Sequence, residues 1–112
     1  MIGATEGVSM DKLQIIWGDL ERTEAIESHI FERAEKILSF SPKATNLVVN
    51  LKTINNTASA GVNTFAVNVE LRLPNHQDVR AEKTGEDVYR LMTDAQHAIL
   101  TQVKSKKEQH LI

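Results

Sequence analysis

Residues 80–89, Arg-Ala-Glu-Lys-Thr-Gly-Glu-Asp-Val-Tyr, lead without a long loop into an amphipathic segment that extends to Lys107. The beginning of this stretch is typical of a short strand. Thr84 and Asp87 stand three residues apart, which resembles a capping box with Asp in the place of Glu. The stretch therefore predicts a strand that passes into a helix, with Glu86 and Asp87 in an acidic first turn and lysines in a basic last turn.

The segment after this junction carries an apolar residue at nearly every third or fourth position. Such spacing places these residues on one side of a helix of about 20 residues, facing a core. The predicted core stripe consists of Val88, Leu91, Met92, Ala95, Ile99 and Val103.

The segment before the junction alternates between apolar and polar residues, which is the pattern of a strand with one buried face. Its apolar positions are Phe65, Val67, Val69, Leu71 and Leu73. A further strand is predicted from Leu47 to about Ile54, and a first one from Leu13 to Trp17. The polar stretch 55–61 is predicted to be a mobile hairpin loop, and 74–78 a turn.

A first helix is predicted between the first two strands. Thr23 has the character of an N-cap, and Glu24 and Glu27 follow in the first turn, where the helix dipole favours carboxylates. The Ser41-Pro42 pair ends the helix, because the residue before a proline is driven out of the helical region. Its apolar stripe consists of Ile26, Ile30, Ala34, Ile37 and Leu38.

The predicted order of elements is β-α-β-β-β-α. It indicates a two-layer α+β domain, with a four-stranded, mostly antiparallel sheet and both helices on one face. We expect a flexible leader at 1–11, a single domain at 12–108 and a tail at 109–112. With 112 residues, 41% of them hydrophobic and 25% charged, the chain is suited to one core.

The composition narrows the classes of function. The chain has no cysteine, so it has no disulfide framework and no thiolate nucleophile. No segment is typical of a signal peptide or a membrane span, so we expect a cytoplasmic location without membrane association. The net charge of −2 means that any nucleic-acid surface depends on local segregation of charge.

No pattern in the chain indicates catalysis. There is no nucleophile elbow and no glycine-rich phosphate loop. The histidines lack the i, i+4 spacing of a helical metal pair. We therefore expect no catalytic residues, no metal, no cofactor and no small-molecule substrate. The histidines concerned are His29, His76, His97 and His110.

Basic residues are arranged more regularly than the histidines. Arg90, His97 and Lys104 repeat every seven positions and so lie along one line of the second helix. Arg33 and Lys36 are three apart on the first helix. These residues form either a solvated surface or an RNA-binding surface, and on their own they favour the former. Further basic candidates on the exposed sheet face or its edges are Lys52, Arg72, Arg80 and Lys83.

Three short motifs together resemble one protein family. The segment 23–26, Thr-Glu-Ala-Ile, opens the first helix, and Ala-Glu at 81–82 leads to Glu-Asp-Val-Tyr at 86–89. Gln-Val followed by spaced lysines closes the second helix at 102–107. In this order they resemble the ribosome hibernation-promoting factors, which include the ribosome-associated translation inhibitor and are also called sigma-54 modulation proteins. The resemblance covers about residues 12–108.

The resemblance implies the same β-α-β-β-β-α fold and binding to the small ribosomal subunit, through 16S rRNA and ribosomal proteins. It implies occupation of the channel for mRNA and tRNA, and inhibition of translation in stress or stationary phase. It also implies a short form without an appended dimerisation domain. The predicted rRNA-binding residues are Arg33, Lys36, Arg80, Lys83, Arg90, Lys104 and Lys107.

Two other classes of function compete with this one. A diverged protein–protein module would keep the fold with weak or no rRNA binding, and would act on a regulator or as a homodimer through the sheet face. Segment 21–38 of the first helix has five Glu and only three basic residues. Because few cations are available there for phosphate contacts, we expect any ribosome binding to be weaker and more sensitive to salt. A double-stranded RNA-binding domain is disfavoured, because Glu86 and Asp87 would repel phosphates at the start of the last helix. An enzyme is the weakest alternative.

Overall fold

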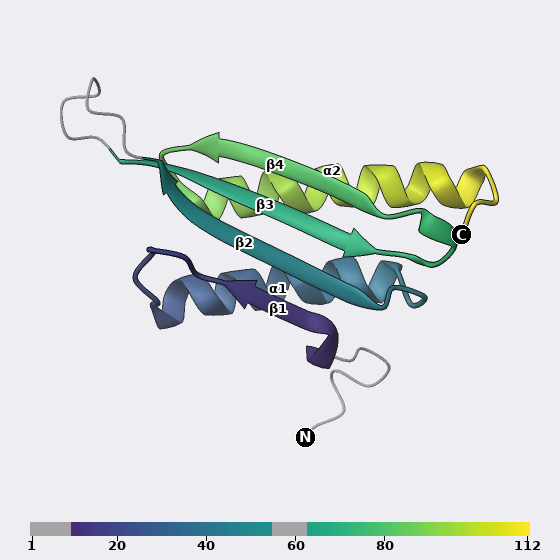
Figure 1. The fold of residues 1–112 in the computed structure, drawn as a ribbon, viewed down its shortest axis with the longest axis horizontal. Coiled ribbons are helices and arrows are strands. Elements are labelled where there is room, and N and C mark those ends of the chain that lie inside the picture. Colours follow the sequence, from purple (N-terminus) through teal and green to yellow (C-terminus); the bar gives the residue numbers. More distant parts are fainter. Residues whose placement is uncertain (1–9, 55–62) are drawn as a thin grey trace.

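The computed structural model describes residues 10–54 and 63–112 of the chain (Figure 1). The predicted order of elements is confirmed, while the predicted loop at 55–61 and most of the predicted leader lie outside the described residues. Short 3-10 turns, η1 (Met10–Lys12) and η3 (Pro74–His76), precede the first and last strands. The main elements are β1 (Leu13–Ile16), α1 (Glu24–Phe40), β2 (Asn46–Ile54), β3 (Thr64–Arg72), β4 (Val79–Gly85) and α2 (Val88–Glu108).

The four strands form one sheet in the order β1-β2-β3-β4. The α1 crossover makes β1 and β2 parallel neighbours, while β2–β3 and β3–β4 are antiparallel, so the predicted, mostly antiparallel sheet is confirmed. In this register Val49 lies opposite Val69, and Val69 lies opposite Ala81. One face of the sheet is therefore apolar across three strands.

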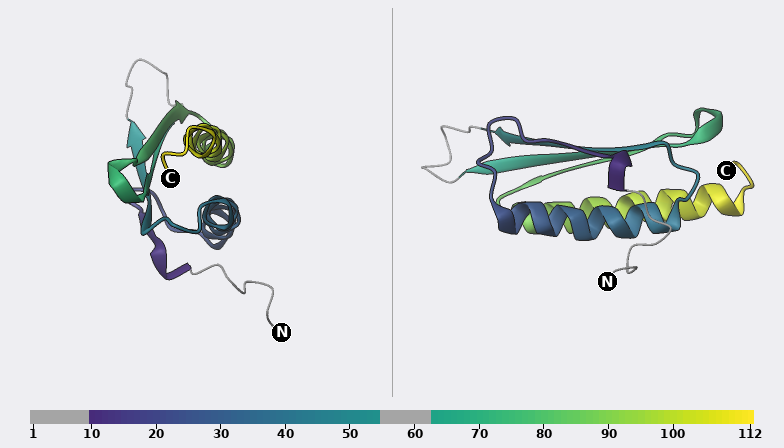
Figure 2. Two further views of the ribbon diagram at one scale, coloured as in Figure 1. Left: turned by 90° about the vertical axis from the view of Figure 1, so that its right-hand side faces the viewer. Right: turned by 90° about the horizontal axis from the view of Figure 1, so that it is seen from below.

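Both helices cover this apolar face, side by side, as predicted (Figure 2). The stripes predicted for the two helices supply most of their buried residues; Ile30 and Ile37 of α1 and Met92 and Ile99 of α2 have no exposed surface. Burying an aliphatic side chain of this size stabilises the fold by about 1.5–3 kcal/mol. The layered arrangement is thus held mainly by apolar contacts between sheet and helices.

The opposite face of the sheet is open and polar, and it faces the viewer in Figure 1. Glu70 lies on this face between two arginines, with oxygen–nitrogen distances of 3.8 Å to Arg72 and 3.6 Å to Arg80. Exposed ion pairs of this kind contribute about 0–1 kcal/mol each. Lys52 and Asn50 are also exposed here. The alternation of strand residues has therefore separated an apolar inner face from a charged outer one.

Both ends of α1 follow the prediction. The hydroxyl oxygen of Thr23 accepts a hydrogen bond from the backbone N–H of Ile26 at 3.2 Å, so Thr23 is the N-cap. The helix ends at Phe40, and Ser41, the residue before Pro42, leaves the helical region with φ −133°.

A tight turn after β1 positions the start of α1. Gly18 has φ +62°, and a Cβ atom at this position would lie 2.6 Å from the carbonyl oxygen of Leu51. The next residue, Asp19, accepts a hydrogen bond from the backbone N–H of Thr53 at 3.1 Å, which lowers the pKa of its carboxyl. The turn therefore closes against β2 and needs glycine at position 18.

We expect Gly18→Ala to lower the free energy of unfolding by about 1–3 kcal/mol, because it combines a left-handed backbone with a clash against another strand. Chemical denaturation measures this change. Gly85→Ala is the matched control, since a Cβ there meets only the flexible Leu91 side chain, at 3.2 Å. Equal stability of Gly18→Ala and the unsubstituted protein would contradict the described turn.

Candidate nucleic-acid interface

The two helices run parallel and meet along a line that we call the interhelical seam. It is marked by three contacts of α1 with α2: His29 with Tyr89 and Thr93, Arg33 with Gln96, and Phe40 with Lys107. The partners are 60 to 67 residues apart in the sequence. The seam thus gathers polar and basic side chains that come from two distant segments.

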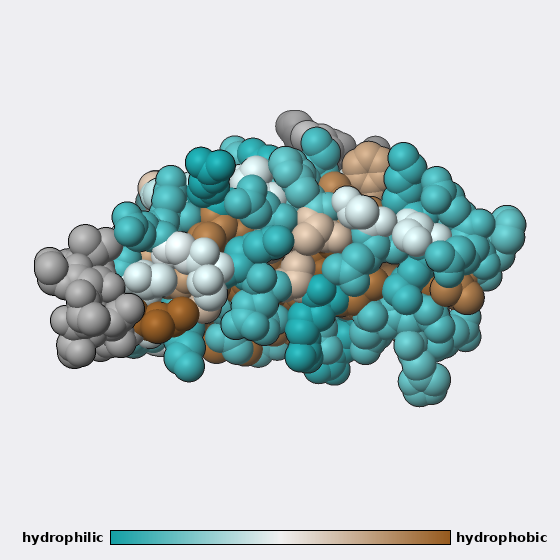
Figure 3. Space-filling model, turned by 90° about the horizontal axis from the view of Figure 1, so that it is seen from above, coloured by the Kyte–Doolittle hydropathy of each residue, from teal (hydrophilic) through white to brown (hydrophobic). Residues whose placement is uncertain are grey.

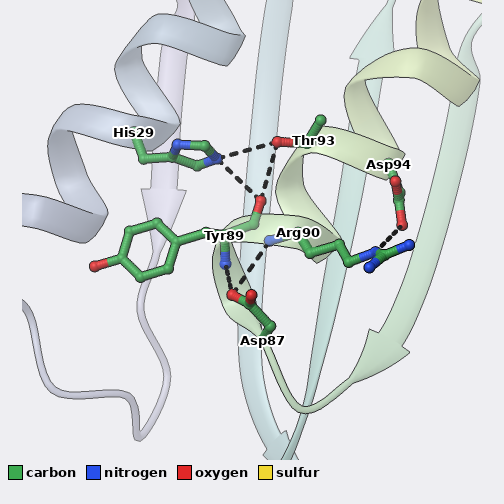
Figure 4. A network of polar contacts seen from close by, with 6 residues as sticks. All are labelled: His29, Asp87, Tyr89, Arg90, Thr93 and Asp94. Atoms are coloured by element: carbon green, nitrogen blue, oxygen red, sulfur yellow. Dashed lines mark hydrogen bonds and ion pairs between the residues drawn. The ribbon is translucent and has the colours of Figure 1, made fainter.

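The start of α2 differs from the prediction. Thr84 remains in β4, paired with Ala66, and Asp87 is itself the N-cap. The Asp87 carboxylate accepts hydrogen bonds from the backbone N–H groups of Tyr89 at 3.0 Å and Arg90 at 3.4 Å (Figure 4). The capping-box assignment and the acidic first turn are therefore wrong. The sheet ladder holds Thr84, whereas the short Asp87 side chain reaches the free amides of the first turn.

This cap fixes Tyr89 against α1. The Nε2 of His29 lies 3.0 Å from the carbonyl oxygen of Tyr89 and 3.3 Å from the Thr93 hydroxyl (Figure 4). A carbonyl oxygen only accepts, so the tautomer assigned to His29 carries its proton on Nε2. The His29 and Tyr89 rings meet edge to face at 5.2 Å. Tyr89 is 41% exposed, and its hydroxyl points away from the network.

Arg33 forms the middle of the seam. Its Nη1 donates to the Oε1 of Gln96 at 3.1 Å, and Gln96 is only 1% exposed. The Nε of Arg33 is buried and has no hydrogen-bond partner among the described residues. This predicted rRNA-binding residue therefore packs between the helices and presents only part of its guanidinium to solvent.

The far end of the seam opens into a pocket of about 400 Å³. The Nζ of Lys107 donates to the carbonyl oxygen of Phe40 and so ties the end of α1 to α2. The lining residues are Phe40, Leu100, Val103, Lys104 and Lys107. Sequence reasoning did not single out Phe40, which lies outside the apolar stripe of its helix.

Four of the predicted rRNA-binding residues lie at or beside the seam. Arg33, Lys104 and Lys107 contribute to its contacts or its pocket. Lys36 lies three positions after Arg33 and four before Phe40, so it shares their flank of α1, and it is exposed. Charge from both helices is therefore combined on one surface.

The other three predicted residues lie away from the pocket. Arg90 shares the line of Lys104 on α2 but lies two heptads earlier, where its Nε is 4.0 Å from a carboxylate oxygen of Asp94. Arg80 lies on the open face of the sheet with Glu70, and Lys83 lies on the opposite side of β4, since the two are an odd number of positions apart. The predicted set is thus divided between at least two surfaces.

Acidic residues limit the basic surface on one side. Glu24, Glu32 and Glu35 lie along the outer flank of α1, opposite its buried stripe, and the first two are exposed. Phosphate groups would be repelled there. Among the ion pairs of residues 10–54 and 63–112, none involves a lysine. Lys36, Lys104 and Lys107 are therefore unpaired by acids and gathered along one seam, where they can meet an external anion together.

The side of the molecule where α2 lies against β4 is mostly hydrophilic, with hydrophobic residues exposed only in separate small patches (Figure 3). An extended apolar patch would mark an obligate protein interface. This side therefore offers a hydrophilic surface rather than an apolar one.

No group of three or more His, Asp or Glu side chains in the described part of the chain could hold a metal ion. Within 10–54 and 63–112, neither helix has the length and apolarity required to cross a membrane.

Comparison with known proteins gives a family. A family model described as Sigma 54 modulation protein / S30EA ribosomal protein matches residues 13–110. None of the curated proteins that were searched matches the chain. A ribosomal subunit interface protein from Coxiella burnetii is similar in structure, with a TM-score of 0.64 and 16% identity, over 86% of this chain and 97% of that one. The N-terminal domain of Thermus thermophilus Protein Y has a TM-score of 0.62 and 20% identity, over 84% and 97%.

The start of α2 can be tested by substitution. We expect Asp87→Ala to lower the free energy of unfolding by about 1 kcal/mol, because two first-turn amides lose their acceptor. Asp87→Asn should retain most of the stability, and Thr84→Ala should have a smaller effect. Thermal or chemical denaturation distinguishes the two caps. A larger loss of stability for Thr84→Ala than for Asp87→Ala would show that Thr84 is the N-cap and would contradict this assignment.

Proposed function

The chain belongs to the Sigma 54 modulation protein / S30EA ribosomal protein family, and from this we propose that it is a ribosome-binding inhibitor of translation. It would bind the small ribosomal subunit and occupy the channel for mRNA and tRNA in stress or stationary phase. The proposed role is binding without catalysis, and its site of action is the cytoplasm, where ribosomes are found.

The observation that carries this proposal is the family match, which spans residues 13–110 and so includes every strand and both helices. The fold is shared with a ribosomal subunit interface protein and with the N-terminal domain of Protein Y, which supports the same architecture. Because the match covers the whole domain, both helices and the seam between them belong to the common framework.

We infer that rRNA would approach the seam and the neighbouring side of α2. Lys36, Lys104 and Lys107 are exposed and unpaired by acids among the described residues, and Arg33 adds part of a guanidinium. Lysine and arginine contacts to phosphates supply most of the affinity in such complexes. The acidic flank of α1 would then face away from the RNA.

A second candidate, a protein–protein module of the same fold, is favoured by one observation. Glu24, Glu32 and Glu35 make the outer flank of α1 acidic, and the net charge of the chain is −2. A basic protein surface would be attracted to that flank. The two candidates differ in the surface used, so charge substitutions separate them.

Co-sedimentation with purified small ribosomal subunits across a salt series tests the proposed function. We expect binding at low salt that weakens steeply as salt rises, because phosphate contacts release counterions. Failure to sediment even at low salt would exclude ribosome binding.

The seam is tested by neutralising two lysines. We expect Lys36→Gln with Lys104→Gln to weaken binding and to reduce the slope of log affinity against log salt by about one for each lysine. The matched control neutralises two cations of the open sheet face, Lys52→Gln with Arg72→Gln, and should bind like the unsubstituted protein. If the sheet-face variant bound more weakly and the seam variant bound normally, the RNA contact would lie on the sheet face instead.

A further inference from the structure

We propose that the pocket at the far end of the seam holds an unpaired nucleotide of the RNA, with its base against Phe40 and its phosphates on Lys104 and Lys107. This inference rests on the proposed function and specifies how the same surface would recognise RNA. It adds base stacking to a surface otherwise described by charge alone.

The first argument is the exposure of Phe40. This residue ends α1 and is 52% exposed, although an aromatic ring of this size is normally buried. It forms one wall of the pocket, and Leu100 and the buried Val103 of α2 line it too. The Lys107 side chain holds the Phe40 carbonyl, so the end of α1 is fixed against α2. An apolar wall of this kind is pre-formed to receive a flat ring.

The second argument is the charge around this wall. Lys104 and Lys107 line the pocket, and its lining residues include no carboxylate. Lys36 lies one helical turn before Phe40, and Lys43 follows shortly after it; both are exposed. An apolar ring surrounded by ammonium groups is complementary to a base that carries a phosphate. Proteins that bind single-stranded RNA use this combination of an aromatic platform and a cationic track.

The third argument concerns size and polar groups. The volume of about 400 Å³ lies within the range of about 300–1,000 Å³ that is usual for ligand pockets. A smaller pocket of about 230 Å³ adjoins it through Lys107 and is also lined by Ser41. The Ser41 hydroxyl is in a side chain only 2% exposed and has no hydrogen-bond partner among the described residues. This hydroxyl is buried beside the smaller pocket and does not line the larger one, so the fit of a base depends on the volume and on the lysines.

The test compares two half-exposed phenylalanines of the same helix. Phe40→Ala should weaken binding to purified small ribosomal subunits about tenfold or more, because base stacking is lost. Phe40→Tyr should bind nearly as well as the unsubstituted protein. Phe31→Ala is the matched control: Phe31 is 45% exposed but lies beside β1, with Leu13 and Trp17. Circular dichroism and melting curves establish that each variant is folded.

Unchanged binding of folded Phe40→Ala would overturn the pocket while leaving the proposed function in place. A titration of the ¹⁵N-labelled protein with a short oligouridylate gives an independent readout, and we expect shifts at the amides of Leu100, Val103 and Lys104. Absence of these shifts would overturn the proposal, even if the protein sediments with ribosomes. If the peptide acetyl-Asp-Phe-Asp amide shifts them and the RNA does not, the pocket is a peptide site and the proposal is wrong.

Discussion

The contact of two amphipathic helices with one face of the sheet is the constraint on which the rest of this structure depends. Leu47, Val49, Val69 and Leu71 of the sheet are buried because α1 and α2 cover the face on which they lie. A four-stranded sheet has room for both helices only side by side, which Figure 2 shows. Their parallel alignment then creates a long seam, and the polar residues flanking each apolar stripe meet there.

The partial burial of Arg33 in the seam is unfavourable for stability, and it also affects how much of its charge is available to bind RNA. A guanidinium taken from water is destabilising unless it finds hydrogen-bond partners, and Arg33 has one in the described residues, Gln96. Its Nε has none there. The same charge that would attract RNA thus also takes part in the packing of the helices. Lys36 and Lys104 are free of this conflict because they are exposed, which makes them the clearest probes of binding.

Periodicity was sufficient to predict the strands, the helices and their core residues, because burial of one face is imposed locally at every second or every third and fourth position. The N-cap of α2 was mispredicted because Thr84 and Asp87 are both residue types that commonly cap helices. Thr84 pairs with Ala66 in the sheet, which leaves Asp87 as the cap. Local sequence does not contain that pairing.

The candidate site was less accessible from sequence. His29 and Tyr89, or Phe40 and Lys107, are more than fifty residues apart, and only the tertiary arrangement brings them together. The basic residues could be identified, but not their surfaces. Arg80 lies on the open sheet face with Glu70, while Arg33 is partly buried between helices. The proposed partner rests on the family membership, and the proposed surface rests on the geometry of the seam.

Directed hydroxyl-radical probing is the most direct test of the claim that the helical side, rather than the sheet, faces rRNA. Because the chain has no cysteine, a single cysteine can carry the iron chelate without competing sites. His97→Cys places it on α2 and Asn50→Cys on the open sheet face; both positions are exposed. The account predicts strong cleavage of small-subunit rRNA from position 97 and weak cleavage from position 50. Strong cleavage from position 50 alone would contradict it.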